Sequence, residues 1–140
     1  MGNRAVITTE ENFKNNGIGI YLHSNGGYDS VNAFLRYCEL KGYRTPEKDE
    51  YGWARLCQVL GNFFGGVDSI GIDKVDNLDC ANGDNGVYII EDWKIIDRKY
   101  FKKQEQKNHS MKDMLIAIDN AMPAKEQIKE NIDSYINAKI

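Results

Sequence analysis

Apolar positions repeat with the spacing of an α-helix in four stretches of the chain. Because a helix turns once every 3.6 residues, apolar side chains three and four positions apart share one face. This pattern predicts helices at about 30–41, 50–64, 110–122 and 124–140. The 50–64 stretch is the most hydrophobic of the four. A Gly-Gly pair ends it, and Pro123 separates the last two helices.

Five other stretches have the composition or the alternation of β-strands. β-Branched residues fill 4–9, and apolar residues alternate with polar or small ones at 18–23 and 67–75. Two further apolar runs, 87–90 and 93–96, flank Glu91-Asp92 and predict a tight hairpin. The polar residues between the first two strands predict a loop there. The predicted order of elements is β-β-α-α-β-β-β-α-α.

This order favours an α+β fold in one domain. Neighbouring strands joined by short turns pair antiparallel, because parallel strands need a long crossover. We therefore expect a mainly antiparallel sheet of about five strands with helices packed on one face. A chain of 140 residues, 41% of them hydrophobic, suffices for one core, so we expect residues 1–140 to form a single domain. The helical segment 110–140 could pack on this domain or face a partner.

Two glycines, Gly52 and Gly61, fall inside the predicted 50–64 helix. Each weakens an exposed helix by roughly 1 kcal/mol relative to Ala. We therefore expect another backbone to approach the helix closely at both positions.

Composition excludes several broad classes of protein. A net charge of -3 argues against non-specific nucleic-acid binding by the whole surface, which needs clustered Lys and Arg. No apolar run is long enough to span a bilayer, so we expect a cytoplasmic protein. The odd number of cysteines (Cys38, Cys57 and Cys80) predicts reduced thiols, with Cys38 as a small buried apolar residue. We expect no cofactor.

The turn after the predicted 18–23 strand gathers polar side chains that could carry chemistry. His23, Asn25, Asp29 and Ser30 lie within it, beside a Gly-Gly pair. A base and a carboxylate at this range could serve hydrolysis, with His23, Asp29 and Ser30 as candidate catalytic residues. Free N–H groups at the start of the following helix would favour a phosphate, with Asp29 or Ser30 as N-cap. A plain strand-to-helix connection fits the same residues.

Acidic residues gather at 68–92, which holds seven acids and one base. Asp73, Asp76, Asp79 and Asp84 are candidates for binding a partner by charge complementarity. With Asn77, Asn82 and Asn85 they form an oxygen-rich set that suits a hard cation such as Ca²⁺. Their spacing does not match the register of an EF-hand, so we assign no metal site. A solvated turn is the simpler interpretation of this loop.

The following stretch, 93–112, has the opposite charge, with seven bases and two acids. Four of its bases, Arg98, Lys99, Lys102 and Lys103, surround Tyr100-Phe101. Such a basic segment (94–112) could bind nucleic acid by pairing with phosphates and stacking on bases. If the acidic and basic stretches lie side by side in the fold, they neutralise each other instead.

Three segments resemble small proteins carried by phages and mobile elements of Gram-positive bacteria. They are the turn at 21–30, Tyr-Gly-Trp-Ala-Arg-Leu at 51–56 and Gly-Val-Tyr-Ile-Ile at 86–90. No catalytic motif accompanies the resemblance. It implies an anti-defence role, in which small acidic proteins bind and block host proteins, as anti-CRISPR proteins do.

Three hypotheses follow from these observations. The first is a non-enzymatic inhibitor whose acidic loop binds a host protein, namely a CRISPR-Cas nuclease effector. The second is a nucleotide- or phosphate-binding or -cleaving protein that uses His23, Asp29 and Ser30. The third is a nucleic-acid binder that uses the basic segment. We favour the first, because no residue pattern specifies a reaction.

Overall fold

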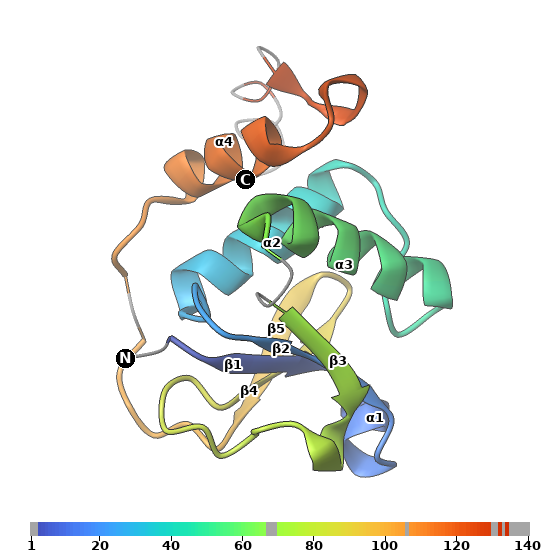
Figure 1. Cartoon of the computed structure of the whole chain (residues 1–140), viewed down its shortest axis with the longest axis vertical. Helices are drawn as coiled ribbons and strands as arrows, with labels where there is room; N and C mark the ends of the chain where they lie inside the picture. The colour runs from blue at the N-terminus through green and yellow to red at the C-terminus, as the bar shows by residue number, and fades with distance from the viewer. Residues whose placement is uncertain (1–2, 67–69, 106, 130–131, 133, 135–140) are drawn as a thin grey trace.

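A single five-stranded sheet forms the centre of the chain. The computed structural model describes residues 3–66, 70–105, 107–129, 132 and 134. The strands are β1 (Ala5–Thr8), β2 (Ile18–Leu22), β3 (Ile70–Lys74), β4 (Val87–Glu91) and β5 (Lys94–Lys99). They lie in the order β3-β2-β1-β4-β5 (Figure 1). β1 and β4 are parallel and the other three pairings are antiparallel, which confirms the mainly antiparallel α+β fold.

Two long helices cover one face of this sheet, and a third packs on top of them (Figure 1). The helices are α1 (Glu10–Lys14), α2 (Tyr28–Leu40), α3 (Glu50–Phe64) and α4 (Met111–Ala121), with short 3₁₀ turns η1 (Val75–Asn77) and η2 (Ala124–Glu126). α2 and α3 lie on the sheet, and α4 lies on α2 and α3. α3 has the bounds that its apolar spacing predicts. Within the described ranges, no helix is both long and apolar enough to cross a membrane.

The sheet buries apolar residues on both of its faces. The larger core lies under α2 and α3 and includes Ile7, Ile20, Phe34 and Leu60. A smaller cluster on the opposite face consists of Val6, Val87 and Ile89, with Phe13, Tyr21, Leu78 and Cys80 packed against it. All four residues of β1 are buried. Since successive strand residues point to opposite faces, both faces of the sheet must be covered at β1. α1 and the 75–86 segment therefore cover the face that α2 and α3 leave open.

α1 was predicted as a loop and is helical for a local reason. The Thr9 side chain caps it by accepting a hydrogen bond from the Asn12 N–H (3.3 Å), and two glutamates fill its first turn. Phe13 then packs on the smaller cluster. The Thr-Glu-Glu sequence is typical of a helix start. Because Phe13 is the one apolar residue of this short helix, no helical spacing of apolar residues could reveal it.

The hairpin turn lies one residue later than predicted. Asp92 and Trp93 form it, both with positive φ (53° and 60°), and β5 therefore starts at Lys94. The Trp93 ring is buried, and its Nε1 donates to the Tyr43 carbonyl (2.9 Å). Burial of this ring explains why a residue unsuited to a turn occupies one.

The predicted 124–140 helix lies mostly outside the described residues. Its described start is the short turn η2, followed by non-helical Gln127 and Ile128. Buried Asp119 holds this start, because its carboxylate accepts hydrogen bonds from the backbone N–H groups of Ile128 and Lys129 and from the Tyr37 hydroxyl. Ile128 and Ile132 pack against the main core, so at these positions the segment contacts its own domain.

The two glycines of α3 differ in their surroundings. A Cβ on Gly52 would lie 2.3 Å from the carbonyl carbon of Thr45, so the helix and the Thr45–Pro46 backbone are in close contact there. A Cβ on Gly61 would meet no atom within 4 Å. The expected close approach is confirmed at Gly52 and wrong at Gly61.

Candidate functional site

The turn between β2 and α2 uses its polar side chains to hold the fold together. Both oxygens of Asp29 accept backbone N–H groups: Oδ1 from Ser30 (2.8 Å), and Oδ2 from Asn108 (2.5 Å) and His109 (2.9 Å). The buried Ser30 hydroxyl accepts from Asn25 Nδ2 (3.4 Å). His23 is exposed. Asp29 and Ser30 therefore tie the 108–109 linker and the turn to α2.

The same turn already uses the N–H groups of Gly26 and Ser30 within the fold. α2 begins two residues earlier than predicted, with Gly27 as an N-cap that makes no side-chain bond, so neither Asp29 nor Ser30 is the cap. The Gly26 N–H donates to the Asn3 carbonyl (2.8 Å), and the Gly26 carbonyl accepts from the Tyr88 hydroxyl (2.7 Å). The Asp29 carboxylate already stands in the first turn, where it opposes a second anion.

The acidic loop is built around Asn82, a structural role that its sequence context did not predict. The Asn82 side chain is only 4% exposed. Its Oδ1 accepts the backbone N–H groups of Asp84, Asn85 and Gly86, and its Nδ2 donates to the carbonyls of Asp79 and Gly86. One amide thus satisfies five backbone groups, which fixes the path of the loop.

The loop gives its four candidate aspartates different environments. Asp84 turns inward, and its Oδ2 accepts from the N–H (3.1 Å) and the Nε (2.8 Å) of Arg4. Its side chain is 22% exposed, against 53% for Asp79, which lies 3.6 Å from Arg4 Nη1. Asp73 accepts from Lys74 and Asn77, and Asp76 is exposed. Asp84 is therefore part of the structure, and the other three face solvent.

The basic segment is partly neutralised within the domain. Arg98 is nearly buried, stacked between the rings of Tyr88 and Phe101 (3.9 and 3.8 Å from its guanidinium carbon) and paired with Glu105. Its Nη2 also donates to the Asn85 carbonyl of the acidic loop (2.7 Å). The prediction that Arg98 binds nucleic acid is therefore wrong. Its guanidinium group is enclosed within the domain, where it connects the basic segment to the acidic loop.

The three lysines of the candidate set lie closer to the surface. Lys99 pairs with Asp97 (3.0 Å), and Lys103 Nζ donates to the Gly83 carbonyl (2.7 Å), while Lys102 is exposed. The acidic and basic stretches therefore lie side by side. The bonds between them end on the carbonyls of Asn85 and Gly83, whereas Arg98 and Lys99 pair with acids of the basic stretch itself.

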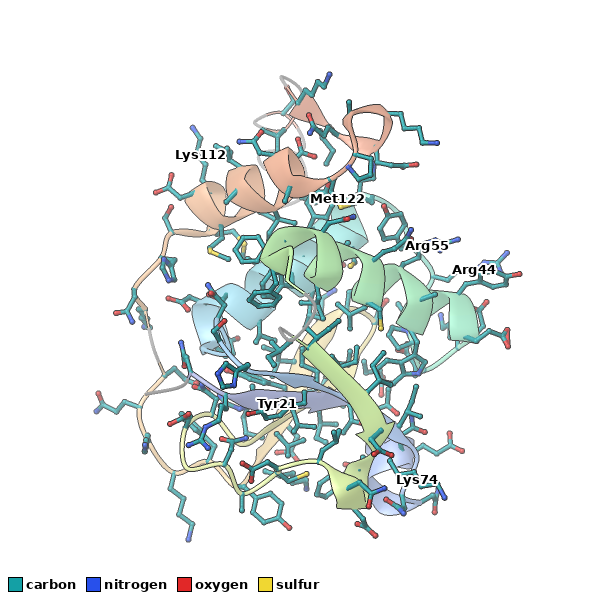
Figure 2. All side chains as sticks on the ribbon, viewed as in Figure 1. Tyr21, Arg44, Arg55, Lys74, Lys112 and Met122 are labelled. Atoms are coloured by element: carbon teal, nitrogen blue, oxygen red, sulfur yellow. The ribbon has the colours of Figure 1, made fainter. Side chains whose placement is uncertain are left out.

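An open depression of about 380 Å³ lies beside the exposed aspartates. We call it the acidic depression; it is lined by Phe13, Val75, Asp76, Leu78, Asp79, Cys80, Ala81 and Tyr100. Tyr100 is 61% exposed and has a positive φ of 57°. Burial and the charges of Asp79 and Asp76 raise the pKa of the Cys80 thiol. The acidic depression lies near the end of β3, which is next to α1 (Figure 1). Figure 2 labels Lys74, the last residue of β3.

The two kinds of aspartate predict different effects on stability. The hydrogen bonds from Arg4 hold the pKa of Asp84 below its usual range, although burial opposes this. Asp84→Asn should lower the free energy of unfolding by about 1–2 kcal/mol at neutral pH, and Asp76→Asn by less than about 0.5 kcal/mol. Urea titrations of both variants measure the difference.

The same variants give a test by pH. Since the pKa of Asp84 is lower in the folded than in the unfolded state, its stabilisation is present above the unfolded value, about pH 4, and is lost as the pH falls through the folded value. The gap between wild type and Asp84→Asn should therefore close in acid. A gap that persists in acid, or equal effects of Asp84→Asn and Asp76→Asn, would contradict this role for Asp84.

The remaining candidates are the buried cysteine thiols and possible clusters of metal ligands. Burial raises the pKa values of the Cys38 and Cys57 thiols, which disfavours their reactive thiolate forms. No three His, Cys, Asp or Glu side chains among the described residues gather as metal ligands.

Sequence reasoning missed the apolar half of the acidic depression. Phe13 comes from the unexpected helix α1, and Leu78 from a loop noted for its charges. Tyr100 was noted only as part of the basic segment.

Comparisons of the chain with protein-family models, with curated proteins and with solved structures each give no match.

Proposed function

We propose that this chain is a non-enzymatic binding protein that inhibits a host defence protein. In this proposal, the acidic depression docks on a basic surface of the partner that otherwise binds nucleic acid. The observation that carries the proposal is the acidic depression itself, where two exposed carboxylates stand beside an exposed aromatic ring.

The make-up of the acidic depression supports protein binding. Protein interfaces typically combine an apolar, often aromatic centre with a polar rim. Here Phe13, Leu78 and Tyr100 supply the apolar part, and Asp76 and Asp79 supply the charge. Oppositely charged rims speed association and fix the orientation of the two partners.

The environment of the candidate catalytic residues also favours binding over catalysis. Both carboxylate oxygens of Asp29 accept hydrogen bonds from backbone N–H groups. The Ser30 hydroxyl is buried beneath α4, 4.0 Å from the Met114 sulfur. A nucleophile needs a base within hydrogen-bond reach and an open path to substrate. Ser30 has an amide partner, Asn25, in place of a base.

The partner class follows from charge and from the resemblance to mobile-element proteins. Nucleases hold nucleic acid in positively charged channels, because the backbone phosphates must be neutralised. An acidic surface can occupy such a channel. CRISPR-Cas nuclease effectors of Gram-positive bacteria are therefore the partners to test first.

Charge reversal in the acidic depression tests the proposal. The variant Asp76→Lys/Asp79→Lys should bind a purified effector at least about tenfold more weakly than wild type, a loss of about 1.4 kcal/mol. Its melting temperature should stay close to that of wild type, because both side chains are exposed or nearly so. Biolayer interferometry against each effector, repeated at about 50 and about 200 mM salt, measures the affinity and its screening.

A matched control separates local charge from net charge. Glu91→Lys/Asp113→Lys changes the net charge equally at two exposed positions away from the acidic depression, and it should retain binding. If no effector binds wild type, or if both double variants bind equally well, the proposed function is wrong.

A further inference from the structure

A second depression, of about 430 Å³, lies at the edge of the helical layer. It is lined by Gly42, Tyr43, Arg44, Tyr51 and Arg55. Tyr43 and Arg44 follow the end of α2, whereas Tyr51 and Arg55 lie one turn apart on α3. The two arginines project side by side from this edge (Figure 2). We call it the arginine–tyrosine pocket.

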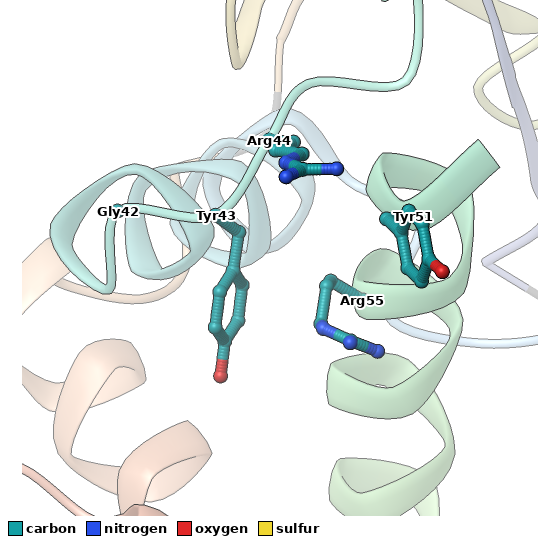
Figure 3. A pocket seen from close by; sticks show the side chains of 5 residues that line it. All are labelled: Gly42, Tyr43, Arg44, Tyr51 and Arg55. Carbon is teal, nitrogen blue, oxygen red and sulfur yellow. The ribbon is translucent and has the colours of Figure 1, made fainter. Parts of the chain in front are cut away.

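The pocket combines two aromatic rings with two guanidinium groups. Figure 3 shows the rings of Tyr43 and Tyr51 on opposite sides, with the arginine side chains between them. The guanidinium carbons of Arg44 and Arg55 lie 5.4 and 5.8 Å from the centre of the Tyr51 ring. Tyr51 is 52% exposed, so its ring is accessible from solvent.

The fold holds Arg44 in place through the cap of α3. One oxygen of Asp49 accepts the N–H groups of Tyr51 (2.8 Å) and Gly52 (3.3 Å), and the other pairs with Arg44 (3.1 Å). The arginine is thereby positioned over the first turn of the helix. Asp49 uses only part of the donor capacity of Arg44, because a guanidinium carries five N–H groups.

Arg55 supplies positive charge that Asp49 does not cancel. Its Nη1 donates to the neutral amide of Gln58 (3.3 Å). Among the described residues, no carboxylate forms an ion pair with it. Burial and the charges of Cys38 and Glu126 raise the pKa of the Tyr43 hydroxyl, and the charge of Arg55 opposes this rise. The pocket therefore carries a net positive charge between two tyrosines.

From this arrangement, we propose that the arginine–tyrosine pocket binds a nucleotide unit. Guanidinium groups bind phosphate through paired N–H donors, and tyrosine faces stack on nucleobases. The pocket volume lies within the range of small-ligand sites. The nucleotide comes either from the free pool or from a single strand of nucleic acid, since both present the same base and phosphate. This site is separate from the acidic depression, which lies on the other face of the sheet.

Calorimetric titration of the whole chain tests the proposal with defined probes. They are the four ribonucleoside 5′-monophosphates, the matching nucleosides, inorganic phosphate and a short single-stranded DNA. We expect at least one monophosphate, or the single strand, to bind with a Kd of about 1 mM or tighter. Nucleosides and inorganic phosphate should bind at least about tenfold more weakly, because each lacks one of the two groups recognised.

Variants show whether the pocket residues are responsible. Arg44→Gln/Arg55→Gln and Tyr51→Ala should each weaken binding at least about tenfold, whereas Tyr51→Phe keeps the ring and should bind like wild type. Lys14→Gln/Lys74→Gln removes the same charge at two exposed positions elsewhere and should also bind like wild type. Thermal melting of each variant confirms that it is folded.

Three outcomes would overturn the proposal. They are binding of none of the probes, binding of inorganic phosphate as strong as that of every nucleotide, and unchanged affinity in Arg44→Gln/Arg55→Gln. Binding by the single strand alone would support the proposal and identify the source. The variant Asp76→Lys/Asp79→Lys should bind nucleotide normally, so failure here leaves the proposed inhibitor function untouched.

Discussion

Replacing Asn82 with Ala should lower the free energy of unfolding by about 3 kcal/mol or more. The substitution removes the acceptor of three backbone N–H groups and the donor to two carbonyls, in a side chain that is almost fully buried. A buried polar group left without a partner costs about 1–3 kcal/mol. The Asn85 N–H keeps the Arg4 carbonyl and the Gly86 carbonyl keeps the Val6 N–H, and opening of the loop to water lowers the cost further. We therefore expect less than the sum over five groups.

Urea denaturation followed by circular dichroism measures this loss. Asn77→Ala is the control, because Asn77 lies in the same segment but makes one exposed hydrogen bond, to Asp73. It should cost less than about 0.5 kcal/mol. Asn82→Ala should also weaken partner binding, since the loop positions Asp79 and Leu78. Equal stability of the two variants would show that Asn82 does not organise the loop.

Gly52→Ala should destabilise the chain by about 2–3 kcal/mol. The added methyl group would lie 2.3 Å from Thr45 and 2.5 Å from Pro46, and both of these contacts are with backbone atoms. Backbone cannot rotate away as a side-chain end can, so α3 and the Thr45–Pro46 segment must separate. Arg44 precedes this segment directly, and its geometry in the arginine–tyrosine pocket should change as well.

The second glycine of the same helix provides the control. Gly61→Ala meets no atom within 4 Å, and it should raise the free energy of unfolding by about 0.5–1 kcal/mol through the better helix propensity of Ala. Thermal and chemical unfolding of both variants should therefore give effects of opposite sign. A shared sign would mean that the close approach at Gly52 does not limit packing.

The sequence allowed prediction of elements whose signal is local and repeated. α3 has enough apolar positions to show its period, and it begins and ends where predicted. The β1–β4 pairing has no such signal, because Val6 meets Val87 across 80 residues of chain. The number of strands and the α+β fold class could be predicted from the sequence. The parallel pairing of β1 with β4 at the centre of the sheet could not.

The site residues show the same limit. Asp76 and Asp84 have similar neighbours in the sequence, yet only Asp84 meets Arg4, because β1 and β4 are adjacent. In the sequence, Arg98 cannot be distinguished from the neighbouring surface lysines. In the structure, the rings of Tyr88 and Phe101 enclose its guanidinium group. The arginine–tyrosine pocket joins two helices whose relative position depends on the close contact at Gly52. Such pairings are set by tertiary structure and leave no pattern in the local sequence.

Titration of a purified CRISPR-Cas effector with this chain, with DNA cleavage as the readout, tests the central claim most directly. A non-enzymatic inhibitor should suppress cleavage fully at about one equivalent per effector, with no deepening over time, since a tight blocker acts by occupancy. The variant Asp76→Lys/Asp79→Lys should leave cleavage intact at the same ratio. Inhibition far below one equivalent that deepens with incubation would reveal an enzyme, and undiminished cleavage at every ratio would contradict the inhibitor role.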